Sequence, residues 1–161
     1  MYIEKYLEDY IGGTDDCLTL LDYLAEKQKE EITLGEIMSD IGLDKLNGQF
    51  RTTNIFLEYQ DEEGFDREFH YAIDILTYLA ALLLECKVNG SVNMRNLWGY
   101  DEDEEHIIRI TATPKEHELM NNTLMDFVAN PLAYDLSEMV PEEDMLEIAE
   151  ICKELRKDLY E

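Results

Sequence analysis

One acidic run in the chain has the composition of a cation-binding loop. Residues 101–106 read Asp-Glu-Asp-Glu-Glu-His, which resembles the opening of a calcium loop. Such a loop needs a glycine at its sixth position and a bidentate glutamate at its twelfth. The sixth position here is His106 and the twelfth is Ala112. We therefore expect a solvated acidic loop, with no metal and no cofactor.

Residues that commonly carry catalysis do not form known catalytic patterns. The glycine spacing matches no phosphate-binding loop, and none of the three serines lies in a G-x-S-x-G sequence. His117 is not followed by a second histidine one helical turn later, which excludes a zincin helix. The three cysteines, Cys17, Cys86 and Cys152, are scattered among apolar residues and are assigned to the core. We therefore expect no catalytic residues and no enzyme.

Two clusters combine acidic residues with aromatic ones. At an interface, tyrosine and tryptophan supply anchoring area, and carboxylates steer and pair with arginine or lysine. The predicted partner-binding residues are Tyr59, Asp61, Glu62, Glu63, Trp98, Tyr100, Asp101, Glu102, Asp103, Glu104 and Glu105. In the alternative interpretation, the rings belong to the core and the charges keep the protein soluble.

The charge balance narrows the class of partner. The chain has 38 Asp and Glu against 13 Lys and Arg, a formal net charge of -25. Binding to nucleic acid needs clustered basic residues, so this charge disfavours nucleic acid and anionic membranes and favours a basic protein. The longest apolar stretch is too short to span a bilayer. The first ten residues lack the pattern of a signal peptide, and three widely spaced cysteines indicate no disulfide framework, so we expect a cytoplasmic protein.

Periodicity and end signals predict the elements that would position the clusters. Thr14 suits the N-cap of one helix, and Gly42 suits the end of another. Alternation in 53–60 places Leu57 and Tyr59 on the same face of a strand. The predicted helices span 3–10, 14–30, 33–41, 65–87, 114–130 and 141–159, and the predicted strands span 53–60, 91–98 and 106–113. We expect one α+β domain over residues 1–161, rich in helix, with a small antiparallel sheet of about three strands.

One segment imitates a DNA-binding motif. Residues 33–43 look like the first half of a helix-turn-helix, in which 44–51 would be the recognition helix. That helix would offer only Lys45 and Arg51 to DNA, whereas recognition helices carry several contacting side chains. A helical hairpin that packs the core is therefore the preferred interpretation.

A single acidic domain without catalytic motifs, with tips such as 98–105, resembles the small immunity proteins of bacterial toxin systems, including those of contact-dependent growth inhibition. The resemblance implies a cytoplasmic inhibitor that binds a basic, nuclease-like toxin at or near its active site. A DNA mimic explains the same charge but needs a regular array of carboxylates on an elongated surface, so it ranks second. An enzyme with an unrecognised carboxylate site ranks third.

Overall fold

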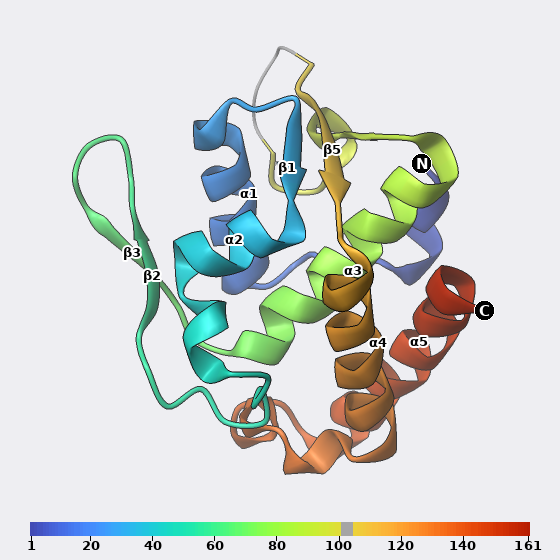
Figure 1. Cartoon of the computed structure of the whole chain (residues 1–161). Coiled ribbons are helices and arrows are strands. Elements are labelled where there is room, and N and C mark those ends of the chain that lie inside the picture. Colours follow the sequence, from blue (N-terminus) through green and yellow to red (C-terminus); the bar gives the residue numbers. More distant parts are fainter. Residues whose placement is uncertain (101–104) are drawn as a thin grey trace.

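Helices and two small sheets build the fold, shown in Figure 1 as a computed structural model. The structure describes residues 1–100 and 105–161. The elements, with η for a 3-10 helix, are η1 (Tyr2–Tyr6), α1 (Asp15–Lys27), β1 (Glu31–Thr33), α2 (Leu34–Ile41), η2 (Leu43–Leu46), β2 (Leu57–Gln60), β3 (Asp66–Phe69), α3 (Ala72–Asn89), β4 (Val92–Asn93), η3 (Met94–Asn96), β5 (Ile107–Thr111), α4 (Pro114–Ala129), η4 (Pro131–Ala133), η5 (Asp135–Glu138) and α5 (Glu142–Tyr160). The α+β class predicted from sequence is confirmed.

Helix α3 forms the centre of the core. Its residues from Ala72 to Glu85 are all buried, as expected for a helix that is apolar nearly all round. In Figure 1, α1 and α2 lie on one side of α3, and α4 and α5 lie on the other. The helix ends at Gly90, whose φ of 82° is the left-handed conformation that glycine accepts readily. Among the described residues, no helix combines the length and the hydropathy needed to cross a membrane.

The larger sheet has the strand order β1-β5-β4. Strand β4 pairs with β5 in the antiparallel sense, as predicted, but it covers only Val92–Asn93 of the predicted strand 91–98, because the 3-10 helix η3 follows it. Strand β1 was not predicted, and it pairs with β5 in the parallel sense, with Glu31 opposite Arg109. The sheet is therefore mixed, and its parallel pair joins segments that are far apart in the sequence.

Strands β2 and β3 form a separate antiparallel hairpin that projects from the body of the molecule (Figure 1). The predicted strand 53–60 is shorter than expected and begins at Leu57. The predicted helix 65–87 was wrong in its first part, because Asp66–Phe69 is strand β3. A turn at Gly64, with a φ of 88°, brings this segment back beside β2, and the pairing overrides its helical pattern.

The remaining differences lie at short helices. The predicted helix 3–10 is only the 3-10 helix η1. The segment 44–51 forms no recognition helix, because only the four-residue η2 is present there. Thr14 accepts a hydrogen bond from the Cys17 amide at 3.2 Å, which confirms the predicted N-cap of α1. The helix-turn-helix interpretation therefore has no structural support.

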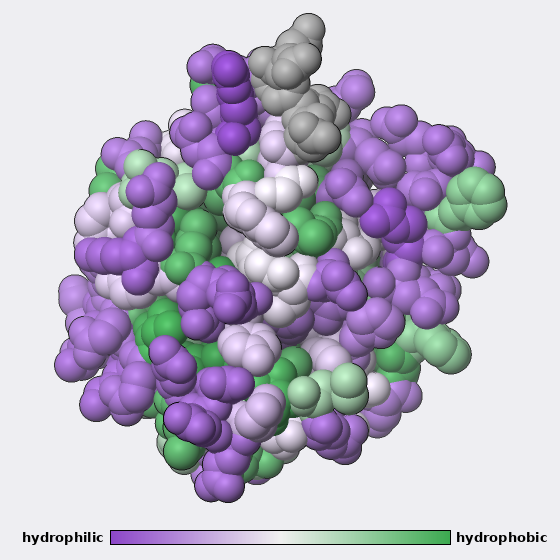
Figure 2. All heavy atoms as spheres, turned by 180° about the vertical axis from the view of Figure 1, so that it is seen from behind, coloured by the Kyte–Doolittle hydropathy of each residue, from purple (hydrophilic) through white to green (hydrophobic). Residues whose placement is uncertain are grey.

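Hydrophilic side chains cover most of the face shown in Figure 2, and smaller apolar areas lie between them. Large apolar side chains that stand most exposed are Phe56, Phe65, Trp98 and Met139, with exposed fractions between 65% and 79%. Two of these rings, Phe65 and Trp98, lie beside the acidic clusters singled out from the sequence.

Candidate partner-binding site

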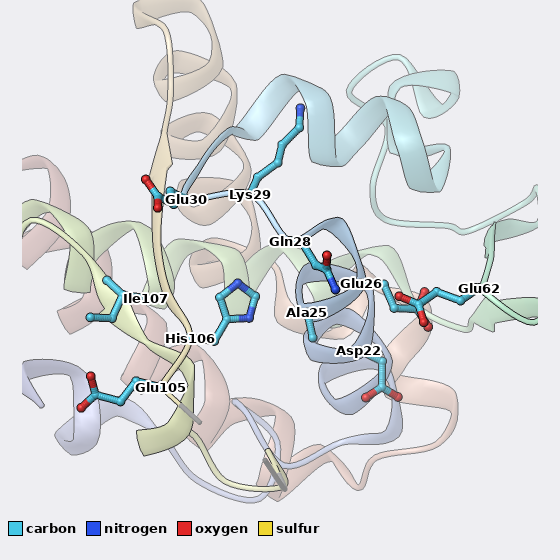
Figure 3. A pocket seen from close by; sticks show the side chains of 10 residues that line it. All are labelled: Asp22, Ala25, Glu26, Gln28, Lys29, Glu30, Glu62, Glu105, His106 and Ile107. Carbon is cyan, nitrogen blue, oxygen red and sulfur yellow. The ribbon is translucent and has the colours of Figure 1, made fainter. Parts of the chain in front are cut away.

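A groove of about 500 Å³ brings the two predicted clusters together. Glu62, from the turn of the β2–β3 hairpin, and Glu105, which precedes β5, line the same groove (Figure 3). The lining residues are Asp22, Ala25, Glu26, Gln28, Lys29, Glu30, Glu62, Glu105, His106 and Ile107. Among the described residues, the lining therefore includes five acidic residues and one lysine, and the Glu105 side chain lies on the outer side of its strand.

Helix α1 and the segment after it form one wall of the groove. Asp22 and Glu26 are one helical turn apart, so they share a face of α1. The helix ends at Gln28, whose φ of 51° is left-handed, and the chain then crosses to β5. There the Arg109 amide donates a hydrogen bond of 2.8 Å to the Glu30 carbonyl. The parallel pairing of β1 and β5 thus sets the width of the groove.

The opposite wall comes from β5 and the residues before it. In Figure 3, His106 points toward Gln28, whereas Glu105 and Ile107 point to the other side of the strand. Tyr100 is half-buried, and its hydroxyl lies 3.2 Å from His106 Nδ1. This contact connects the second predicted cluster to the groove.

The carboxylates of the groove repel one another. The Glu26 and Glu62 side chains approach each other in Figure 3. Burial raises the pKa of Glu26, and the charges of Glu62 and Asp61 raise it further. Lys29, the only lysine among the described lining residues, is held by Glu36 at 2.5 Å. A cation that entered the groove would relieve this repulsion.

A second hollow, of about 360 Å³, adjoins the groove and shares Glu26 and Glu62 with it. Tyr59 lines this hollow but is only 8% exposed. Its ring packs edge-on against Tyr23 with 5.3 Å between centroids, and lies 6.2 Å from Phe69. The structure thus places Tyr59 in the core behind the acidic surface.

The other predicted residues differ in their surroundings. Asp61 closes the hairpin turn, because its Oδ1 accepts hydrogen bonds from the Glu63 and Phe65 amides at 3.0 and 2.9 Å. Glu62 and Glu63 are exposed. Trp98 is 68% exposed, beside a further hollow. The remaining four predicted residues lie outside the described residues: Asp101, Glu102, Asp103 and Glu104. They make up most of the acidic run that resembles the opening of a calcium loop.

Three carboxylates of the groove were missed in the sequence. Asp22 and Glu26 are four residues apart on α1, a spacing that could have identified them as neighbours on one helix face. Glu30 lies beyond the end of α1, so its place in the groove depends on the path of the chain after Gln28. Within residues 1–100 and 105–161, no three His, Cys, Asp or Glu side chains are grouped so that they could hold a metal ion.

Comparison with known proteins identifies the family. No curated protein and no solved structure matches the chain. A family model described as immunity protein 68 matches residues 2–159, which is nearly the whole sequence. The resemblance to immunity proteins of toxin systems is thereby confirmed. The chain belongs to the immunity protein 68 family and is an immunity protein of a toxin and immunity system.

Proposed function

We propose that this immunity protein neutralises a basic, nuclease-like cognate toxin in the cytoplasm by binding it at the acidic groove, without catalysis. The observation that carries the proposal is the concentration of acidic residues in one groove, where Glu26 and Glu62 approach each other and Asp22, Glu30 and Glu105 also belong to the lining. These residues come from three separate segments of the chain, so the concentration of charge is a product of the fold.

Electrostatics explains why such a groove suits a nuclease. An enzyme that binds nucleic acid presents lysine and arginine to the phosphates of its substrate. Carboxylates in the groove can pair with the same side chains and so occupy the substrate's place. The net charge of -25 speeds the encounter with a basic partner.

The shape of the site favours this function over DNA mimicry. A mimic would present carboxylates in a regular array along an elongated surface, as the phosphates of a duplex lie. Here the carboxylates line a concave groove, which suits a protruding basic segment of a partner. The absence of known catalytic motifs supports an inhibitor that acts by binding.

The test measures association with the toxin encoded beside the gene. The triple variant Glu26→Gln, Glu62→Gln and Glu105→Gln removes three groove charges. We expect it to slow association by about tenfold or more, since electrostatic steering speeds encounter by about 10- to 1,000-fold. The matched control is Glu143→Gln, Glu150→Gln and Glu154→Gln on α5, which lies across the molecule from the groove in Figure 1.

The control separates the groove from net charge, because both variants lose the same number of charges. The control should bind nearly as fast as the unchanged protein. Equal slowing of both variants would show that only net charge matters. Recovery of assorted DNA-binding proteins in place of one toxin would favour the DNA mimic.

A further inference from the structure

A small hollow of about 270 Å³ lies beside Trp98, apart from the acidic groove. Its other walls come from residues 7–13, which connect η1 to α1, and from Tyr78 of α3. Sites for drug-sized ligands usually measure about 300 to 1,000 Å³. This hollow is therefore suited to a single side chain of a bound protein.

Trp98 is held over the hollow by the residues on both sides of it. Leu97 is buried, with 3% of its surface exposed. Gly99 has a φ of 83° and approaches α1 so closely that a Cβ there would lie 2.3 Å from Leu18 Cδ2. The fold thus fixes the backbone around Trp98 while leaving its indole 68% exposed. Exposed tryptophans in fixed positions are common anchors of protein interfaces.

Tyr78 lines the hollow with the end of its ring that carries the hydroxyl. The residue is only 1% exposed. A Cβ on Gly12, which also lines the hollow, would lie 3.8 Å from the Tyr78 Cζ atom that carries the hydroxyl. A hydroxyl at the wall of the hollow can accept a hydrogen bond from a group that enters it.

The charges around the hollow indicate which kind of group it would bind. Glu8 and Asp9 line it, and no lysine or arginine does among the described residues. Glu8 Oε1 is buried and has no hydrogen-bond partner there. Burial raises the pKa of Glu8, and three nearby carboxylates, Glu147, Asp9 and Asp144, raise it further. The surroundings therefore favour a cation over a neutral or anionic group.

We propose that this hollow is a socket for one arginine side chain of the bound toxin. The inference rests on the proposed function and deepens it. Arginine combines an apolar stem, which suits Leu7 and Ile11, with a planar guanidinium that stacks on an indole better than an ammonium does. Trp98 covers the guanidinium, the Tyr78 hydroxyl accepts one of its hydrogen bonds, and Asp9 balances its charge at the rim.

The socket and the acidic groove lie along the same face of α1. Leu18, which contacts Gly99 beside the socket, precedes Asp22 and Glu26 of the groove at intervals of four residues. One partner can therefore fill the socket with an arginine while other basic side chains lie in the groove.

The first test needs no toxin, because Trp98 is the only tryptophan in the chain. The probe is the peptide acetyl-Gly-Arg-Gly-amide, titrated while the fluorescence of Trp98 is recorded. We expect a saturable change, weakened severalfold in Tyr78→Phe and in Asp9→Asn but retained in the groove variant Glu105→Gln. The control peptide has citrulline, which has nearly the same shape without the charge. An equal response to citrulline, or a response without saturation, overturns the socket.

The second test uses the toxin and separates the two proposals. Trp98→Ala and Tyr78→Phe should raise the dissociation rate by about tenfold or more, as for an interface anchor, with little change in association rate. If the toxin binds the wild-type protein and dissociates from these variants at the same rate as from the wild type, the socket is wrong and the proposed function stands. If the toxin does not bind the unchanged protein, the proposed function fails, and the peptide titration still decides the socket.

Discussion

Asp16 and Asp74 bring two buried carboxyl groups into direct interaction where α1 meets α3. Burial raises the pKa of Asp16, while hydrogen bonds from the backbone amides of His70 and Tyr71, at 2.9 and 3.0 Å, act against this rise by stabilising its charged form. Burial, and next the charge of Asp16, raise the pKa of Asp74 to about 8. At neutral pH Asp74 therefore keeps its proton.

The variant Asp74→Asn should stabilise the protein at pH 8. A raised pKa in the folded state means that folding retains a proton that the unfolded chain releases near pH 4, so stability falls as pH rises from about 4 to about 8. Asparagine removes this loss, and the free energy of unfolding at pH 8 should rise by about 1 kcal/mol or more. Urea unfolding at pH 5 and pH 8 measures the effect. The exposed Asp15→Asn is the control, and an unchanged pH slope in Asp74→Asn would contradict the prediction.

The variant Asp126→Asn should destabilise the protein at neutral pH. Asp126 accepts two hydrogen bonds from Arg51, at 2.8 and 2.6 Å, and one from the Tyr134 hydroxyl at 2.7 Å. These contacts, Arg51 above all, lower the pKa of Asp126 to about 2. A lowered pKa contributes stability above about pH 4 that is lost as pH falls toward 2. The free energies of unfolding of the wild type and of Asp126→Asn should therefore differ at pH 7 and converge near pH 2. A difference that stays constant with pH would contradict the prediction.

Association with the toxin should depend strongly on salt. On the proposed function, the groove carboxylates steer the partner through water, where added ions screen them. Raising the salt from about 0.05 M to about 0.5 M should slow association by about tenfold or more, and change dissociation much less. Stopped-flow mixing separates the two rates. A salt effect confined to dissociation would show that the groove does not steer.

The variant Gly99→Ala should move Trp98. The φ of 83° is left-handed, and alanine pays about 1 to 2 kcal/mol there. Its Cβ would also collide with Leu18 Cδ2 unless that side chain shifts. We expect a lower melting temperature and a changed emission maximum of the single tryptophan. An emission spectrum equal to that of the unchanged protein would mean that Gly99 does not position the indole.

The ends of helices were predictable because their signals are local. Thr14 caps α1 and Gly42 ends α2, as their residue types indicated. The pairing of strands was not predictable from local signals, because it depends on segments that are distant in the sequence. Glu31–Thr33 is a strand because it pairs with β5. Asp66–Phe69 is a strand, although its sequence pattern predicts a helix, because it pairs with β2.

The candidate site was predictable in part. The density of acidic residues identified Glu62 and Glu105, but their meeting in one groove depends on how the hairpin and β5 are placed against α1. Tyr59 was taken as an exposed anchor because acidic residues follow it. The alternation of the strand places it on the face of Leu57, which is buried, so periodicity was the better guide to its position.

On the proposed function, the parallel pairing of β1 with β5 also affects the time at which protection begins. Contacts between distant segments form only after the chain between them has closed into a loop, which slows folding. A chain leaving the ribosome cannot complete the groove before the residues around Arg109 have been synthesised. On the proposed function, a cell that starts to make this inhibitor is therefore unprotected for an interval set by translation and loop closure, so a stock of folded protein must precede the toxin.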